Sequence, residues 1–594
     1  MKRLHPFLPF LGHLLLWVLV TWPLVLDLDT SFVVSRFASS HLWIFDTVVS
    51  GWNGRIPLWL WERGYPAGGA VVLIGWPALA LFAVFRTFCS ALAAYNLTQL
   101  VLGALAGAAA HALARRQGVS ERAAGVGGIA YGVSGYILSI VYIGEIPNFC
   151  HAFLPLLLLA VDACGRSWRA PFAGALAWTA LLSATPYYGL LSIWLVIAYA
   201  IGVLGRDRSL ATLGRLVLFA ALCAAPSIVL LRYFNLLRDL APNLHLLRPA
   251  TGALAVFGER DTWLFMEATL DGLVKPGKAG VPAGTAIQIG YLGVVPLALA
   301  ALAWTRRRRW LVAGWWAAAL VAIALMLGDH LAVGSGMWQT AAGNELILPL
   351  GALKKWVPVL QMIHVPYRAA VVATLCLAML AALAVDKVGR RWFAGFAAAA
   401  LLVDTLLLSP TPWPLPVVHD PVPAPYHAMG EDPADYAVLP FPFECVPQQG
   451  IGKFQRYFYD ATVHHKRVPW GDRLTRDRNT LDMGARQVIS EPFVVGLCGL
   501  LDEQVHPAPA RSTDVSWLAS VGVRWVVVHV DLRDAAQVAP VRQYLEARLG
   551  PARERTDGVE LYAVGTGTIT PAMLGPASLG ATPWPAWLYT VDHP

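Results

Sequence analysis

Long apolar segments separated by short arginine-bearing loops constrain this chain more than any other feature. A helix that spans a bilayer needs about twenty mainly apolar residues. Segments of about this length are predicted near residues 7–26, 93–114, 123–143, 147–163, 170–184, 187–204, 210–231, 286–304, 310–327, 365–385 and 392–408. The run from Val71 to Phe85 is shorter and is expected to be re-entrant or interfacial. The pattern predicts a mainly α-helical, polytopic transmembrane bundle of about eleven helices.

The composition agrees with a membrane protein and argues against a nucleic-acid-binding protein. Of the 594 residues, 57% are hydrophobic and only 14% are charged, whereas an ordinary soluble domain has roughly 25% charged residues. The net charge is +8, but the lysines and arginines fall in short clusters between apolar segments, as in cytoplasmic loops. We therefore expect membrane lipids around the chain and no nucleic acid as a partner.

The positions of these basic clusters predict the orientation of the chain. They hold Arg115, Arg116 and Arg122, then Arg166 and Arg169, then Arg206, Arg208 and Arg215, then Arg306 to Arg309, and finally Lys387, Arg390 and Arg391. Positive charge favours the cytoplasmic side of a membrane. With the N-terminus in the cytoplasm, every basic loop is cytoplasmic. The longer segments 27–92, 233–285 and 328–364 and the tail from Ser409 then lie on the outer face.

The composition changes after residue 408, which predicts three parts: a transmembrane domain over 1–408 with its first outer loop at 27–92, a Pro-rich linker over 409–430, and an extracytoplasmic domain over 431–594. The last part has strand character at 437–440, 523–530 and 559–564 and helical character at 515–521 and 539–549. This order predicts a small α/β domain.

The cysteines and histidines give no sign of a metal site. Seven cysteines are scattered without a CxxC pair, and no histidine lies at ligand spacing. Cys445 and Cys498 lie in the polar tail and can form a disulfide if that tail is exported. No metal-binding residue is predicted, and a divalent cation stays open as a cofactor.

Four carboxylates are the candidate catalytic residues. Asp27 and Asp29 follow the first apolar segment, Glu145 lies in a tight outer turn, and Asp46 lies in an apolar and aromatic stretch expected to form an amphipathic helix on the membrane surface. An ionisable group next to hydrocarbon is a functional candidate, and desolvation suits a carboxylate to general-base work. Solvated residues at a helix end, a turn or a polar helix face are the alternative.

Candidate substrate-binding residues lie near the same predicted membrane face. They are Arg86, Arg232 and Arg368 for a donor phosphate, and Tyr187, Tyr188 and Trp59 for the substrate. An arginine fork matches phosphate oxygens, and aromatic rings can stack on sugars. The alternatives are arginines that snorkel to headgroups and aromatics of the interface belt.

Two further polar features have structural interpretations. Asp404, inside the last apolar segment, is expected to make hydrogen bonds between helices. His464 and His465 in the tail are expected to be a solvated pair.

Several short motifs resemble one family of membrane proteins. Gly54-Arg55-Ile56-Pro57-Leu58-Trp59, followed by Gly64-Tyr65-Pro66, is similar to the first-outer-loop signature of the YfhO-like polytopic bacterial proteins of the GT-C glycosyltransferase superfamily. Further similar segments are Ala94–Leu97, Tyr187–Gly189, Gly290–Gly293, Val365–Arg368 and Gly522–His529. The resemblance covers most of the chain.

This resemblance implies a function and a location. It implies an integral glycosyltransferase of the bacterial inner membrane that takes a sugar from a polyprenyl-phosphate carrier and moves it to a glycan or lipid acceptor of the envelope on the outer face. Family members usually carry Gly-Asp before the first motif, where this chain has Ser35-Arg36-Phe37. Either Asp27, Asp29 or Asp46 has taken that role, or the chain is a non-catalytic envelope assembly or scaffold protein that retains the GT-C fold.

Overall fold

A computed structural model of the chain divides into two compact units. It describes residues 7–33, 38–51, 59–60, 69–70, 75–240, 268–275, 290–333, 336–357, 360, 363, 365–419, 422–442, 451–469, 488, 491–500, 515–530, 535–556 and 558–565. Unit 1 comprises Met1–Ala38, Leu73–Asn235 and Leu246–His419, and unit 2 comprises Ser39–Val72, Leu236–His245 and Asp420–Pro594. The loop motif 54–58, residues 34–37 and Cys445 lie outside the described residues.

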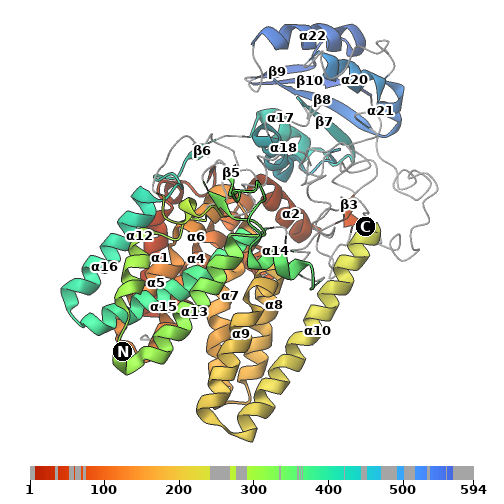
Figure 1. Cartoon of the computed structure of the whole chain (residues 1–594). Coiled ribbons are helices and arrows are strands. Elements are labelled where there is room, and N and C mark those ends of the chain that lie inside the picture. Colours follow the sequence, from red (N-terminus) through yellow and green to blue (C-terminus); the bar gives the residue numbers. More distant parts are fainter. Residues whose placement is uncertain are drawn as a thin grey trace. The chain divides into compact units, whose positions relative to one another are not determined.

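Unit 1 is built almost entirely from helices (Figure 1). They are α1 Leu8–Val20, α3 Trp76–Arg86, α4 Ala91–Arg116, α5 Glu121–Gly132, α6 Gly135–Ile143, α7 Phe153–Ala163, α8 Ala170–Ala184, α9 Pro186–Asp207, α10 Leu210–Leu240, α12 Val294–Leu302, α13 Arg309–Met326, α14 Pro349–Lys354, α15 Ala370–Val388 and α16 Arg391–Val403. Unit 1 also contains two short antiparallel strand pairs. In one, β1 Ser31–Val33 pairs with β6 Val417–His419, and in the other, β4 Ala332–Val333 pairs with β5 Gly336–Met337.

Eight helical segments among the described residues are long and apolar enough to cross a membrane. They are Ala91–Arg116, Glu121–Ile143, Ile146–Ala163, Tyr187–Asp207, Leu210–Leu230, Arg309–Met326, Pro366–Val388 and Arg391–Leu408. All eight coincide with predicted spans. The other three predicted spans contain the shorter helices α1, α8 and α12, and the short run near residue 80 forms α3. The chain is a membrane protein with the predicted fold class.

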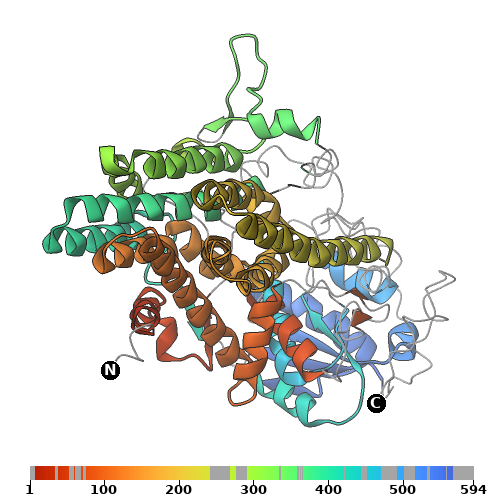
Figure 2. The same cartoon turned by 90° about the horizontal axis from the view of Figure 1, so that it is seen from below.

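The spans differ in how much of their surface the protein covers. The segment of α5 and α6 and the segment that ends in α15 are each 94% buried, whereas Leu210–Leu230 of α10 is only 11% buried. Figure 2 shows α10 running along the side of the bundle. Because hydrophobic side chains cover the exposed face of α10, that face is suited to lipid contact.

Glycines allow the closest helix contacts of unit 1. On α4, a Cβ at Gly103 would lie 2.1 Å from the Trp17 ring of α1, and a Cβ at Gly107 would lie 2.6 Å from His13. On α5, a Cβ at Gly132 would lie 2.7 Å from the Cα of Gly107. Small residues four positions apart let membrane helices approach closely. The pair on α4 therefore brings together α1, α4 and α5.

The arginine-bearing connections meet at one end of unit 1. Just after α4, the Gln117 side chain accepts a hydrogen bond from Trp315 of α13 at 3.0 Å, and the Gly118 carbonyl accepts one from Arg308. Arg308 also pairs with Asp386 of α15 at 3.4 Å, and Arg116 pairs with Asp162 of α7. We call this the arginine end, and we call the opposite end, where α4, α9 and α15 begin, the loop end.

Unit 2 contains a small mixed sheet with helices. The strand order is β7-β8-β10-β9, with β7 parallel to β8 and the other neighbours antiparallel. The strands are β7 Ala437–Phe441, β8 Val523–His529, β9 Glu554–Thr556 and β10 Val559–Ala563, and β2 Trp59–Leu60 pairs separately with β3 Gly69–Ala70. The helices are α2 Ala38–Ser50, α17 Ala424–Glu431, α18 Ile451–His464, α20 Pro492–Gly499, α21 Ser516–Ser520 and α22 Ala535–Leu549. The predicted small α/β fold is confirmed.

The histidine pair of unit 2 differs from its prediction. His464 is buried, with its ring stacked on Tyr426 at a centroid distance of 5.1 Å, and its Nδ1 accepts a hydrogen bond from the Lys466 backbone at 2.8 Å. Only His465 is exposed. The prediction of a solvated pair is therefore wrong for His464, because adjacent residues at the end of α18 point to opposite sides.

Acid should weaken unit 2 through His464. Burial, followed by the charges of His465 and Lys466, lowers the pKa of His464 from 6.5 to about 3. Between these two values the unfolded state binds a proton that the folded state does not, so stability falls as the pH falls below about 6.5. The slope for one proton is at most about 1.4 kcal/mol per pH unit.

Hydrogen exchange of the full-length protein in detergent, corrected for intrinsic rates, measures this slope on peptides of β7, β8 and β10 between pH 7 and pH 4.5. The variant His464→Asn keeps a hydrogen-bond acceptor but does not titrate, so its slope should be smaller. The variant His427→Gln, at an exposed position of α17, should keep the native slope. An equal slope in all three proteins would contradict this account.

Candidate functional site

The second turn of α4 holds two loops at the loop end. The Tyr95 hydroxyl donates to the Gly144 carbonyl at 2.9 Å. The neighbouring Asn96 donates to the carbonyls of Leu28 and Ser31 at 3.0 and 2.9 Å. The turn that carries Glu145 and the segment that carries Asp27 and Asp29 are therefore anchored to adjacent residues of one helix.

A buried ion pair is the centre of the first cluster. Arg368 Nη2 lies 2.8 Å from Glu145 Oε2, and the two side chains are only 13% and 15% exposed. Arg368 Nη1 donates to Thr185 Oγ1 at 2.8 Å, and the Asn148 amide donates to Glu145. Charge-assisted hydrogen bonds of this kind are stronger than neutral ones. They fix both side chains although each lies on a different segment of the chain.

Tyrosines surround the guanidinium group. The Arg368 guanidinium lies 5.3 Å from the centre of the Tyr187 ring, within the range of a cation–π contact. The Tyr188 hydroxyl is hydrogen-bonded to that of Tyr136 at 2.9 Å, and Tyr136 packs against Tyr367. We call Glu145, Arg368, Thr185, Tyr187 and Tyr188 the Glu145–Arg368 cluster. Four of these five residues were predicted from the sequence, from three separate segments.

Asp27 lies at the loop end in a second cluster. Its carboxylate accepts a hydrogen bond from Thr30 and lies 3.2 Å from His419 Nδ1. The pairing of β1 with β6 brings His419 there. Both side chains are substantially exposed, 44% for Asp27 and 60% for His419, so a substrate can reach this carboxylate and imidazole.

Two further candidates, Asp29 and Arg86, lie near the start of α4. Asp29 is exposed and accepts a hydrogen bond from Ser90, the N-cap of α4, at 2.7 Å. Burial and then the Asp29 carboxylate raise the pKa of the Cys89 thiol, whereas Arg86 lowers it. Arg86 Nη1 also donates to the Cys89 carbonyl at 3.4 Å. Asp29 and Arg86 therefore both lie near the start of α4.

The structure places Asp46 differently from its prediction. The stretch from Leu42 to Val49 is helical, as predicted, but Leu42, Trp43, Phe45 and Asp46 are buried in protein instead of facing lipid. Trp43 stacks on Phe458 of α18 at 5.2 Å, and Asp46 lies 4.0 Å from His465. The predicted membrane-surface helix is wrong in this respect, because α18 covers the apolar side chains that would otherwise need lipid.

The remaining predicted residues lie outside these clusters. Arg232 is an exposed residue of α10, and Trp59 lies in the short strand β2 of unit 2. Asp404 accepts hydrogen bonds from the Tyr291 hydroxyl at 2.9 Å and the Val294 backbone at 3.1 Å. Its predicted role in hydrogen bonding between helices is confirmed.

The Glu145–Arg368 cluster contains one buried hydrogen-bond donor that no described residue satisfies. Arg368 Nε is buried and makes no hydrogen bond within the part of the chain that the structure describes. A buried donor without a partner is costly, so a phosphate or hydroxyl oxygen at this position would be stabilised. Within the same described part, no group of three or more His, Cys, Asp or Glu side chains could hold a metal ion.

Thr185 of the Glu145–Arg368 cluster was not predicted from the sequence, and neither were three residues that contact the clusters: His419, Tyr136 and Asn148. His419 lies in the Pro-rich stretch after the last span, and only the β1–β6 pairing brings it next to Asp27. Tyr136 and Asn148 lie in apolar segments with no local sign of function. For Asn148 there was one signal: it follows Glu145 by three residues, in the turn that carries this candidate carboxylate.

The comparisons with known proteins show the fold of this chain and not its activity. The sequence matches no family model and no curated protein. Among solved structures, arabinofuranosyltransferase AftD from mycobacteria matches with a TM-score of 0.51 and 15% identity, over 96% of this chain and 40% of that chain. The chain has the GT-C fold. It spans less than half of that arabinofuranosyltransferase.

Two other GT-C structures are similar at lower scores. The oligosaccharyltransferase AglB from Archaeoglobus fulgidus matches with a TM-score of 0.45 and 12% identity, over 89% of this chain and 70% of that chain. ArnT from Cupriavidus metallidurans matches with a TM-score of 0.38 and 14% identity, over 95% and 99% of the two chains. At these identities the GT-C likeness concerns the fold, and activity has to be argued from the residues of this chain.

Proposed function

We propose that this chain is a membrane glycosyltransferase that takes a sugar from a polyprenyl-phosphate donor. The observation that carries the proposal is the GT-C fold shared with an arabinofuranosyltransferase over 96% of the chain. The acceptor is a glycan or lipid of the cell envelope. In this proposal the arginine end is cytoplasmic, the loop end and the C-terminal domain 431–594 face outward, and the membrane is the bacterial inner membrane.

The two clusters at the loop end have complementary roles in this reaction. Asp27, paired with His419 and exposed, is the general base that removes the proton of the acceptor hydroxyl. Arg368 stabilises the negative charge of the departing lipid phosphate through the positive charge of its guanidinium, and Glu145 holds the guanidinium in position. Arg86 and Asp29 lie beside the start of α4 and can contact the same substrates. Electrostatic stabilisation of this kind is commonly the largest contribution to catalysis.

Exposure makes Asp27 a better candidate for the base than Asp46. Asp46 is 1% exposed and lies in unit 2, 4.0 Å from His465, where an acceptor hydroxyl cannot reach it. Tyr187 is a weak candidate for stacking on a sugar, because it is only 6% exposed and the Arg368 guanidinium lies over its ring. Arg232 and Trp59 lie outside both clusters, so we give them peripheral roles, Arg232 towards lipid headgroups and Trp59 towards the acceptor.

The variant Asp27→Asn should lower glycan transfer by about 100-fold or more, the usual effect of removing a general base. The measurement is the amount of mature lipid-linked glycan, extracted from a deletion strain that expresses each variant at equal level. Glu431→Gln, at an exposed position of α17, is the matched control and should transfer normally. Normal transfer by Asp27→Asn, Asp29→Asn, Asp46→Asn and Glu145→Gln alike would exclude every proposed carboxylate.

A non-catalytic assembly or scaffold protein is the second candidate. The observation that favours it is Glu145, whose carboxylate is already bound by Arg368 and Asn148. In that case deletion of the gene would leave the mobility of lipid-linked glycans unchanged while it altered the assembly of the envelope. The enzyme is favoured if deletion changes the mobility of lipid-linked glycans, and if the native chain reverses that change whereas Asp27→Asn does not.

A further inference from the structure

A groove at the turn between α9 and α10 lies at the arginine end, far along the helices from the clusters described above. It has a volume of about 390 Å³ and is lined by Ile201, Leu204, Leu210 and Leu213, with Arg208 and Ser209 at the turn. Ile201 and Leu210 are strongly exposed, 66% and 87%. Because α9 and α10 are long and apolar enough to cross a membrane, these exposed apolar side chains are suited to contact with lipid.

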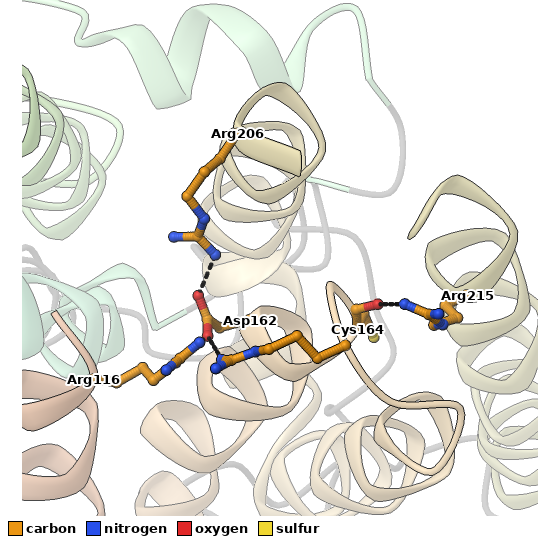
Figure 3. A network of polar contacts seen from close by, with 6 residues as sticks. Arg116, Asp162, Cys164, Arg206 and Arg215 are labelled. Atoms are coloured by element: carbon orange, nitrogen blue, oxygen red, sulfur yellow. Dashed lines mark hydrogen bonds and ion pairs between the residues drawn. The ribbon is translucent and has the colours of Figure 1, made fainter. Parts of the chain in front are cut away.

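Positive charge is concentrated around this groove. The segment from Asp162 to Arg215 and the neighbouring Arg116 contain six arginines but only two aspartates, Asp162 and Asp207. Asp162 is buried and binds three arginines: Arg116, Arg166 at 2.8 Å and Arg206 at 2.6 Å (Figure 3). The Asp207 carboxylate accepts hydrogen bonds from Ser209 and Thr212. The two acids therefore leave an excess of four positive charges.

The arginines at this end are also placed at the depth of a membrane interface. Arg215 Nη1 donates to the Cys164 carbonyl at 2.9 Å (Figure 3). The Arg215 guanidinium also lies 5.1 Å from the centre of the exposed Trp168 ring. Tryptophan and arginine are enriched where the hydrocarbon of a bilayer meets its headgroups. Arg208 has a positive φ of 51° and donates to the Gly205 carbonyl at 3.2 Å, so its side chain is held at the mouth of the groove.

We propose that this groove is a binding site for one anionic phospholipid. An acyl chain lies along Ile201, Leu204, Leu210 and Leu213, and the headgroup phosphate lies at Arg208 and Ser209 within the field of the surrounding arginines. Charge complementarity selects an anionic lipid over a zwitterionic one, because no further carboxylate of the segment is available to neutralise the excess. The site is independent of the proposed glycosyl transfer.

Two substitutions separate the headgroup contact from the acyl-chain contact. Arg208→Asn removes the charge, and asparagine tolerates a positive φ better than most residues. Gly205→Leu fills the groove, and a Cβ at Gly205 meets no other atom within 4 Å, so the protein itself is not strained. The matched controls are Arg390→Asn, an exposed arginine of another connection at the same end, and Gly202→Leu, which also meets no atom within 4 Å and does not line the groove.

Native mass spectrometry of the full-length protein, released from nanodiscs of equal parts phosphatidylglycerol and phosphatidylcholine, measures the retained lipid. The native chain and both controls should retain phosphatidylglycerol with about fivefold preference, the ratio expected for one arginine at a membrane surface. Arg208→Asn should lose the preference, and Gly205→Leu should retain less of either lipid. Equal retention of both lipids by the native chain, an unchanged preference in Arg208→Asn, or undiminished retention in Gly205→Leu would overturn the proposal.

Discussion

Replacing Arg368 with alanine is expected to abolish glycan transfer and to destabilise the transmembrane unit. The guanidinium binds Glu145 and Thr185 at 2.8 Å each. Its removal leaves the Glu145 carboxylate buried without its countercharge, which typically costs about 3–5 kcal/mol. If Arg368 also stabilises the departing phosphate, transfer falls by about 100-fold or more. Thermal unfolding in detergent and the yield of lipid-linked glycan measure the two effects.

A double variant separates the structural effect from the catalytic one. In Glu145→Gln/Arg368→Met no buried charge is left alone, and the neutral replacement of a buried ion pair is often close to neutral for stability. We expect the double variant to regain most of the stability lost in Arg368→Ala and none of the transfer. If transfer returns together with stability, Arg368 has only a structural role.

Replacing Gly103 with leucine should prevent the assembly of α1 with α4. Even a single Cβ atom at this position would lie 2.1 Å from the Trp17 ring, which is fully buried. Overpacking by one methyl group costs about 1–3 kcal/mol, so Gly103→Ala should lower the melting temperature measurably. Gly103→Leu should leave little monodisperse protein in size-exclusion chromatography.

Gly125→Ala is the control for this packing effect. Gly125 lies on α5, and a Cβ there meets no atom within 4 Å, so the substitution should be neutral or should stabilise the helix. Adding Trp17→Ala to Gly103→Leu removes the clashing ring and should restore part of the monodisperse fraction. A Gly103→Leu protein as stable as the native chain would show that α1 does not pack as described.

The spans could be read from the sequence because the cost of burying polar groups in lipid acts on each segment separately. All eight segments that the structure shows to be long enough coincide with predicted spans. The prediction from the sequence was wrong for α2, where contacts with other helices decide which side chains are buried. The apolar face of α2 suggested a lipid surface, and the structure covers it with protein, including Phe458.

The candidate site was predicted in part for a similar reason. Glu145, Arg368, Tyr187 and Tyr188 were chosen because each lies at the outer end of an apolar segment, and alternating helices bring such ends together. Gly103 and Gly107 form a GxxxG pattern that could have predicted the close contact of α1 with α4. Asp162 lies in the last turn of an apolar segment next to arginine loops, which was a local sign of its ion pairs.

The sequence by itself determined which segments are long and apolar enough to cross the membrane and at which end of the bundle the arginines and three of the candidate acids, Asp27, Asp29 and Glu145, collect, because hydropathy and alternating direction are properties of the chain. Only the tertiary structure decided which acid meets which base. Glu145 and Arg368 are 223 residues apart, and Asp27 and His419 are further apart still. Such pairs form because helix packing and the pairing of β1 with β6 close loops of hundreds of residues, and no local pattern encodes the partner of a side chain across that distance.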